Sequence, residues 1–241
     1  MEENKLCFKP INPELRKYGP ILRGRIVILD GLIAAGKSTA GIELQKYAQS
    51  LGIPSVFFPE PLIPDLLKLF LSDQKKYAFA FQLAMLVKRQ KIYHDAQEYA
   101  KKGYFCVIDR SLFGDYCFAL MHKNRGNISE DVNANPDKPS EWISYLTTMK
   151  SEQFEYPDYV VYLKVNEDVA IERCKVRDRD GEKTYDRQYF SELLETYASV
   201  LPSSPSKQFI TVDWNEPRTK EQIPKVILDE IKKLYDNNGG I

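Results

Sequence analysis

Short apolar runs alternate with longer amphipathic segments along the chain. The runs are rich in Val, Ile and aromatic residues and have the length of buried strands. They cover residues 25–31, 55–60, 104–110, 159–165 and 208–214. Helix-length segments lie at about 37–51, 62–102 with a break near Ser72 and Asp73, 112–123, 139–153, 166–178, 186–200 and 218–236. Strands that are apolar on both faces and alternate with helices predict an α/β fold, a five-stranded parallel sheet with helices on both faces.

The length of the chain and its turn-rich segments indicate its domain organisation. At 241 residues without an internal repeat, the chain is long enough for one sizeable domain, which we expect to span residues 1–241. Residues 1–20 contain three prolines and predict an irregular N-terminal arm. Residues 122–140 are polar and rich in turn-forming residues, which indicates a surface loop.

The composition argues against several classes of protein. Lys and Arg number 34, as do Asp and Glu, so the formal net charge is zero, which argues against a general binder of nucleic acid or anionic membranes. No apolar run approaches the ~20 residues of a membrane span, and the first residues lack the apolar core of a signal peptide. The four cysteines form no CxxC pair and predict reduced, packed thiols: Cys7, Cys106, Cys117 and Cys174. We therefore expect a cytoplasmic protein.

The two histidines, His94 and His122, lack the spacing of metal ligands. We interpret both as structural or exposed.

The stretch GLIAAGKSTA directly follows the first apolar run. Gly31, Gly36, Lys37 and Ser38 match the phosphate-binding loop Gly-x-x-x-x-Gly-Lys-Ser. Glycines permit the turn and the close approach of phosphate, while backbone N–H groups and the following helix N-terminus favour an anion. Lys37 would supply charge to the β- and γ-phosphates, and the Ser38 hydroxyl would reach Mg²⁺. The loop is completed by Ala34, Ala35 and Thr39. The motif predicts that a nucleoside triphosphate binds here together with Mg²⁺.

Charged residues follow the next two apolar runs. No Asn-Lys-x-Asp motif of a GTPase is present, and a small phosphotransferase needs a base for the acceptor hydroxyl and a charged group near the metal. Glu60 lies between two prolines at the end of one run, where it could accept the acceptor's proton. Asp109 and Arg110 end another run and could hold magnesium and contact a phosphate. The competing interpretations are a solvated glutamate in a proline turn and an Asp–Arg ion pair at a strand end.

Two predicted helical segments carry further polar candidates. Arg173, Arg177 and Arg179 recur near the end of one helix, where they could close over the transferring phosphate as a lid. Gln82 and Arg89 lie seven residues apart on an aromatic helix and would point the same way, with the glutamine amide suited to a nucleobase edge. The alternatives are a solvated charged helix end and a core helix whose polar residues reach solvent.

Several of these motifs coincide in one order. GLIAAGKST, PEP, YAFAFQ, DRSLFGD and RDRDGEK together resemble the deoxynucleoside kinase family, in particular its deoxycytidine, deoxyguanosine and deoxyadenosine kinase group. The resemblance covers about residues 24–200. The segments around YAFAFQ and DRSLFGD look more like the bacterial-type purine deoxynucleoside kinases than the animal enzymes. The resemblance implies a P-loop kinase fold with an Arg-rich lid at about residues 177–185, and a homodimer.

The resemblance also implies a role for individual residues. Glu60 matches the general base that takes the proton of the 5′-hydroxyl, Arg110 the arginine beside it, and Asp109 the acid of the metal shell. Gln82 matches the base-pairing glutamine, and Arg89 with Asp115 a pair found in the deoxycytidine and purine members. Glu182 matches the acid that contacts the 3′-hydroxyl, and the lid arginines on the donor phosphates are Arg177 and Arg179, joined by Arg173. Apolar residues implied to line the nucleoside pocket are Ile33, Phe81 and Phe118.

Departures from the family pattern leave the preferred nucleoside open. Leu71 stands where many members have a tyrosine that shares the 3′-hydroxyl, so we expect that contact to be missing or supplied elsewhere, with Tyr77 as the candidate. Only Glu182 remains of the paired lid acids. We expect ATP-dependent phosphorylation of the 5′-hydroxyl of a purine deoxynucleoside or deoxycytidine, with no nucleic-acid or membrane partner. The alternatives are a monophosphate kinase of the thymidylate type and a non-catalytic nucleotide-binding regulator.

Overall fold

The five predicted strands form one parallel sheet. The computed structural model describes residues 12–131, 133, 139–150, 157–177, 185–201 and 208–239. The strands are β1 (Ile26–Asp30), β2 (Ser55–Phe58), β3 (Phe105–Asp109), β4 (Tyr159–Lys164) and β5 (Phe209–Asp213). Their order in the sheet is β2-β3-β1-β4-β5, and every neighbouring pair is parallel. The predicted α/β architecture is confirmed.

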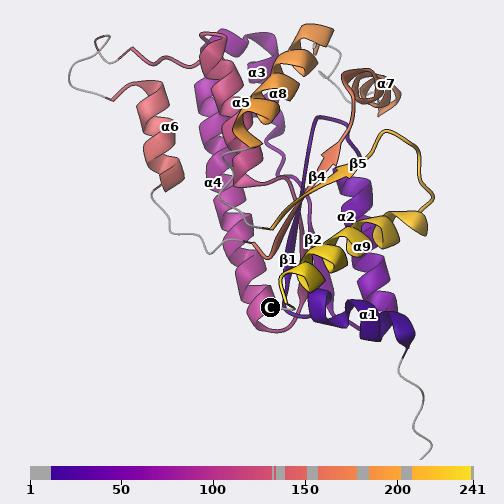
Figure 1. Cartoon of the computed structure of the whole chain (residues 1–241). Coiled ribbons are helices and arrows are strands. Elements are labelled where there is room, and N and C mark those ends of the chain that lie inside the picture. Colours follow the sequence, from indigo (N-terminus) through magenta and orange to yellow (C-terminus); the bar gives the residue numbers. More distant parts are fainter. Residues whose placement is uncertain are drawn as a thin grey trace, which may run out of the picture.

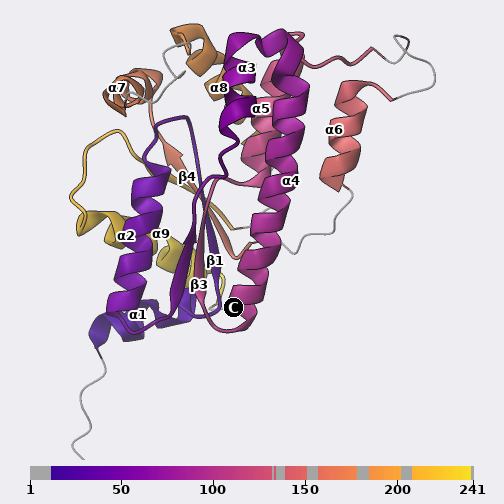
Figure 2. The same ribbon diagram turned by 180° about the vertical axis from the view of Figure 1, so that it is seen from behind.

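Helices cover both faces of this sheet (Figures 1 and 2). One face carries α1 (Pro13–Leu22), α2 (Lys37–Ser50) and α9 (Gln222–Asn237). The other carries the long α4 (Gln74–Lys101) together with α5 (Leu112–Asn124) and α8 (Arg187–Val200). The remaining helices of the described chain are α3 (Pro64–Ser72), α6 (Glu141–Lys150) and α7 (Glu167–Arg177). Asp73 separates α3 from α4 and caps α4 by accepting a bond from the Lys76 N–H, which explains the predicted break.

Alternate residues of the central strand enter separate cores. Val27 and Leu29 of β1 pack into the core shared with α2 and α9. Ile26 and Ile28 pack into a second cluster that contains Tyr93 of α4. Because both faces of the strand are buried, the run must be apolar throughout. Polar residues therefore follow the strand at the carboxyl edge of the sheet, and the site lies at this edge.

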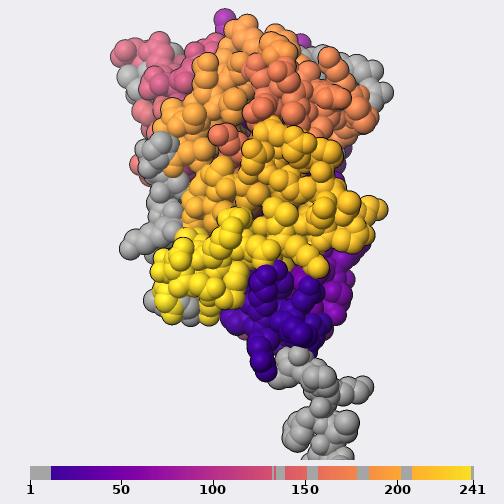
Figure 3. Space-filling model, turned by 45° about the vertical axis from the view of Figure 1, so that its right-hand side comes forward, coloured from indigo at the N-terminus to yellow at the C-terminus, as the bar shows by residue number. Residues whose placement is uncertain are grey.

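The N-terminal segment was incorrectly predicted to be wholly irregular. Residues 12–22 begin with Asn12, whose side chain accepts a bond from the Glu14 N–H, and continue as helix α1. Pro13 occupies the first helical position, where its missing N–H costs nothing. Figure 3 shows this indigo segment against the yellow C-terminal part of the chain, in agreement with the contacts between α1 and α9. Residues 1–11 lie outside the described part of the chain.

The predicted loop at 122–140 also needs correction. Helix α5 continues to Asn124, and both His122 and Ile128 are buried. Ile128 packs in a cluster with Phe70 and Trp142, so this polar stretch contributes to the core. His122 is therefore structural, as one of the two interpretations had it. Burial and, secondarily, Arg125 lower its pKa to about 4.

The described cysteines are packed in the protein interior, as the composition predicted. Cys106, Cys117 and Cys174 are buried and take part in no disulfide bond, and Cys7 lies outside the described residues. Over the described ranges, none of the helices combines the length and apolarity needed to cross a bilayer.

Candidate active site

The loop between β1 and α2 has the backbone of a phosphate cradle. Gly31 has φ 138° and Gly36 has φ 98°, both outside the range that side chains readily adopt, and Ala34 joins them at φ 57°. A Cβ on Gly31 would lie 2.7 Å from the Leu163 carbonyl oxygen, so no larger residue fits. The loop therefore brings its N–H groups and the N-terminus of α2 to one point, which favours an anion.

Lys37 lies buried beneath this loop. Its Nζ donates to the carbonyl oxygens of Leu32 at 2.8 Å and Gly31 at 3.2 Å. Burial, with a smaller contribution from Arg110, lowers its pKa from 10.5 to about 8. The ammonium is thus placed at the cradle with little competition from water, where a bound polyphosphate would be its counter-charge.

Ser38 and Asp109 form a pair of oxygen ligands beside the cradle. Ser38 Oγ donates to Asp109 Oδ2 at 2.6 Å. The other carboxylate oxygen, Asp109 Oδ1, is buried and has no hydrogen-bond partner among the described residues. No cluster of three or more His, Cys, Asp or Glu side chains suited to a metal occurs over those same residues. The pair fits Mg²⁺ when the remaining ligands come from nucleotide phosphates and water.

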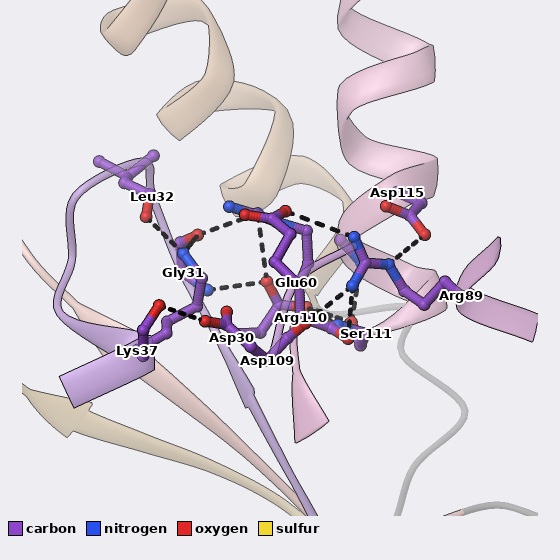
Figure 4. Close-up of polar contacts among 12 residues, drawn as sticks. Asp30, Gly31, Leu32, Lys37, Glu60, Arg89, Asp109, Arg110, Ser111 and Asp115 are labelled. Carbon is purple, nitrogen blue, oxygen red and sulfur yellow. Dashed lines mark hydrogen bonds and ion pairs between the residues drawn. The ribbon is translucent and has the colours of Figure 1, made fainter. Parts of the chain in front are cut away.

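Glu60 and Arg110 connect the β2 and β3 ends to the cradle (Figure 4). Arg110 Nε donates to Glu60 Oε1 at 2.8 Å, and Arg110 Nη1 donates to the Gly31 carbonyl oxygen at 3.1 Å. Arg89 Nη2 approaches the same Oε1 at 3.4 Å. One guanidinium therefore spans the distance between the Glu60 carboxylate and the first residue of the phosphate loop.

The charges around Glu60 determine its protonation. Burial alone would raise the pKa of the carboxyl, but Arg110, Arg89 and Lys37 together hold it at about 2. Within the described part of the chain, both hydrogen bonds of Glu60 end on Oε1 and Oε2 has none. The side chain retains 31% of its surface. At neutral pH, Oε2 of the ionised Glu60 carboxylate is thus available to accept a hydrogen bond.

A cavity of about 500 Å³ joins these groups. Its walls come from the phosphate loop, the β2–α3 segment, α3, α4, the end of β3, α5, α7 and the segment after β5. Predicted site residues that line it are Ile33, Ala34, Ala35, Gly36, Lys37, Ser38, Thr39, Glu60, Leu71, Phe81, Gln82, Asp109, Arg110, Asp115, Phe118, Arg173 and Arg177. The fold thus brings predicted site residues from positions as far apart as 33 and 177 together around one cavity.

Two predicted substrate contacts lie outside this lining. Tyr77 packs with the cluster around Phe70, and Lys76 Nζ sits 5.1 Å from the centre of its ring, so a contact of Tyr77 with the sugar in place of Leu71 stays a prediction. Arg89 lies behind the cavity, only 1% exposed. It donates to Asp115 at 2.5 Å and to the Asp109 carbonyl oxygen at 2.7 Å. Arg89 therefore contributes to the site by holding the carboxylates of Asp115 and Glu60, which line the cavity.

Arg173 lines the cavity, but its guanidinium donates to backbone carbonyl oxygens. It donates to the carbonyl oxygens of Ala35 at 3.2 Å and of Trp214 and Asn215 at 3.0 Å. These bonds join the phosphate loop to the segment after β5, so a contact of Arg173 with donor phosphates stays a prediction. Arg179 and Glu182 lie outside the described residues.

Comparison with known proteins agrees with this geometry. The family model described as deoxynucleoside kinase matches residues 26–236. The chain belongs to the deoxynucleoside kinase family. It is 30% identical to deoxyadenosine kinase of Dictyostelium discoideum, with 88% of this chain and 82% of that protein covered. Deoxyguanosine kinase of Lactobacillus acidophilus is 29% identical, over 86% of this chain and 89% of the relative.

A solved structure of deoxyadenosine kinase from M. mycoides with bound dATP has a similar fold. The TM-score is 0.66 at 25% identity, with 86% of this chain and 98% of that chain covered. The fold is therefore that of the deoxynucleoside kinases, and the chain is a phosphotransferase.

Sequence reasoning about this kinase missed the segment after β5. Trp214, Glu216, Pro217 and Arg218 line the cavity, and the Arg218 guanidinium lies 4.4 Å from the centre of the Trp214 ring. The signal was available, because β5 ends at the same edge of a parallel sheet as β1 and a polar, aromatic segment follows it. The buried partners of Arg110, which include Asp30, were also missed.

The depressed pKa of Lys37 predicts that the kinase takes up a proton when ATP binds above pH 8. With a pKa of about 8, Lys37 is mostly neutral at pH 8.5 and charged at pH 7. Bound phosphates favour the charged form, so binding at pH 8.5 should take up roughly three-quarters of a proton and binding at pH 7 almost none. Calorimetric titration with MgATP in buffers of different ionisation enthalpy measures this uptake. Equal uptake at both pH values would contradict the assignment.

Proposed function

We propose that the kinase transfers the γ-phosphoryl group of ATP to the 5′-hydroxyl of a purine deoxynucleoside or deoxycytidine. One observation carries the proposal: the Arg110 guanidinium contacts both Glu60 and Gly31, so an acceptor beside Glu60 would face a donor in the phosphate loop. In-line transfer requires this juxtaposition of acceptor and donor in one hollow.

Glu60 is proposed to orient the acceptor and take its proton. Oε1 is occupied by arginines, so Oε2 is the atom that would accept the hydroxyl hydrogen. A carboxyl with a pKa of about 2 is a weak base, which suits a reaction in which the proton leaves late. In a loose phosphoryl-transfer transition state the hydroxyl becomes strongly acidic only as its oxygen binds phosphorus. Alignment of the hydroxyl is then the main contribution of Glu60.

The donor is proposed to bind along the phosphate loop. Backbone N–H groups at the N-terminus of α2 and the Lys37 ammonium would hold its phosphates, and Arg110 would contact the group in transfer. When bound, Mg²⁺ would neutralise charge on the donor phosphates, and Ser38 and Asp109 would hold it. Arg177, at the end of α7, lines the cavity, and residues 178–184 of the lid predicted at 177–185 lie outside the described part of the chain.

The base is proposed to bind between α4 and α5. Gln82 is 3% exposed and lines the cavity, and no hydrogen bond joins its amide to another described residue. Asp115, also in the lining, would accept from an exocyclic amino group. Adenine and cytosine carry such a group on their pairing edge, whereas thymine presents a carbonyl oxygen there. Ile33, Phe81 and Phe118 supply apolar walls.

The charge at Glu60 favours a nucleoside over a nucleoside monophosphate as acceptor. A carboxylate facing the 5′ position would repel a phosphate already attached there. Deoxynucleosides and their monophosphates, offered in parallel with labelled ATP, test this directly. We expect label in the 5′-monophosphate when a deoxynucleoside is offered and little transfer to monophosphates. Preferred transfer to a monophosphate would overturn the proposal.

Assembly is proposed from the family resemblance, and location from the composition. The resemblance supports a homodimer, the sparse cysteines support the cytoplasm, and the balanced charge supports the absence of a nucleic-acid or membrane partner. Light scattering on the purified protein measures the oligomeric state, and a monomer at micromolar concentration would contradict it.

Asp115→Asn should shift the choice of base toward thymidine. The amide keeps the shape of the side chain and an oxygen for Arg89, but its NH₂ group can donate to the thymine carbonyl. Because one mismatched hydrogen bond at a buried edge changes, the ratio of kcat/KM for thymidine over deoxyadenosine should rise about ten- to a hundredfold. Asp95→Asn, at an exposed carboxylate that pairs with Lys91 on α4, is the control. An unchanged ratio in Asp115→Asn would remove Asp115 from base selection.

A further inference from the structure

Arg110 is held in an energetically unfavourable backbone conformation. Its φ is 77°, a region that residues other than glycine seldom adopt. The Arg110 N–H donates to the Leu29 carbonyl oxygen at 2.8 Å, and the next N–H, that of Ser111, donates to Asp30 Oδ2 at 3.2 Å. The end of β1 thus fixes the backbone on both sides of Arg110.

The buried carboxylate of Asp30 is shared between the phosphate loop and Arg110's neighbour. Its Oδ1 accepts from the Gly31 N–H at 2.7 Å, and its Oδ2 accepts from both the N–H and the hydroxyl of Ser111. Asp30 has no exposed surface. Gly114 makes room for it, since a Cβ there would lie 2.7 Å from Asp30 Oδ2 and 2.9 Å from the Tyr197 hydroxyl.

Tyr197, on α8, links this carboxylate to the Arg110 side chain. Its hydroxyl donates to Asp30 Oδ1 at 2.7 Å and accepts from Arg110 Nη1 at 3.0 Å. Arg110 Nη1 also donates to Gly31, and Nε donates to Glu60. Across the residues that the structure describes, Nη2 has no hydrogen-bond partner, and Arg110 lines the cavity.

We propose that Asp30 and Tyr197 are positioning residues that fix the Arg110 guanidinium so that Nη2 points at the transferring phosphoryl group. The inference rests on the proposed function. Tyr197 and Gly31 hold Nη1 of Arg110 at the wall of the cavity, and Glu60 holds Nε. The remaining nitrogen, Nη2, is left to contact the substrate. Without the Tyr197 hydroxyl, Nη1 loses an acceptor and Asp30 loses a donor, so the guanidinium gains freedom to rotate. Neither Asp30 nor Tyr197 contacts the substrate in this arrangement.

The test is Tyr197→Phe, which removes only the hydroxyl. Because a misplaced charge weakens the transition state more than the ground state, kcat should fall about ten- to a hundredfold while both KM values stay within about threefold. Tyr162→Phe is the matched control: Tyr162 lies 5.3 Å from Tyr197 ring to ring, and its buried hydroxyl has no partner among the described residues. We expect Tyr162→Phe to retain wild-type kcat.

A double-mutant cycle separates positioning from a general loss of structure. In an Arg110→Lys background, Tyr197→Phe should change kcat by less than about twofold, because the group it positions is gone. An effect of the same size in both backgrounds would overturn the inference. So would a kcat for Tyr197→Phe within about twofold of wild type.

A second variant covers the case in which Tyr197→Phe does not fold. Asp30→Asn keeps an oxygen for the Gly31 and Tyr197 donors but removes the charge opposite Arg110. Its kcat should fall with both KM values little changed, and again only when Arg110 is present. Wild-type kcat for Asp30→Asn would overturn the inference. If the wild-type kinase phosphorylates no deoxynucleoside, the proposed function fails first; a normal wild type with unaffected variants rejects this inference alone.

Discussion

Glu60→Gln is expected to lower kcat by roughly 10²–10⁴-fold while ATP binding is retained. Glutamine keeps the length and shape of the side chain but cannot take a proton, and it places an amide NH₂ where a carboxylate oxygen would receive the hydroxyl hydrogen. The phosphate loop does not involve this side chain, so the dissociation constant for ATP should change little. Initial rates with deoxyadenosine, and calorimetric titration with ATP, measure the two quantities.

The pH profile adds a second test at Glu60. With its pKa held at about 2, the carboxyl stays ionised throughout the range in which the kinase is folded and assayed. Protonation of Glu60 would begin only as the pH falls toward 2, so no acid limb from this group should appear above pH 5. Glu98→Gln, at an exposed carboxylate on α4 paired with Lys101, serves as control for the substitution. Near-wild-type turnover in Glu60→Gln would remove Glu60 from the catalytic role.

Lys37→Met is expected to lower kcat by roughly 10²–10³-fold and to weaken ATP binding as well. Lys37 is only 5% exposed, so its charge acts on phosphate with little screening by water. Methionine fills most of the space of the alkyl chain but offers no donor to the phosphates, or to the Gly31 and Leu32 carbonyl oxygens. Steady-state rates at saturating ATP, together with the ATP dissociation constant, separate the loss in turnover from the loss in binding.

The control for Lys37→Met is the same change at an exposed position. Lys91 on α4 pairs with Asp95, and its side chain is 75% exposed. Lys91→Met should behave as wild type in both measurements. If Lys37→Met also behaves as wild type, the loop binds ATP through backbone groups alone and the Lys37 charge does not contribute.

The fold was predictable largely because its three central strands, β3, β1 and β4, are buried on both faces. The apolar runs of these strands had to be continuous, and the polar residues therefore collect where the strands end. Glu60, Asp109 and the phosphate loop could be assigned to one edge for that reason. Strand order could not be read from the pattern: β3 lies between β2 and β1, and Arg110 at its end makes the connection from Glu60 to the loop.

Contacts between distant segments explain what sequence reasoning missed. Helix α1 is stabilised by packing on α9 some two hundred residues later, which local propensity does not report. Arg89 was correctly paired with Asp115, yet its burial behind the cavity, bonded to the Asp109 carbonyl oxygen, depends on the packing of α4 on β3. Tyr197 gave no signal at all, since one tyrosine in a helix is far more often part of a core than a partner of an active-site arginine.

The most direct measurement is a structure of the kinase with deoxyadenosine and a non-hydrolysable ATP analogue bound together. We expect the 5′-hydroxyl oxygen within about 3 Å of Glu60 Oε2, with the analogue's phosphates in the loop at residues 31–37 and its terminal phosphorus facing that hydroxyl. A nucleoside bound with its 5′-hydroxyl away from Glu60, or a terminal phosphate on the far side of the loop, would contradict the account.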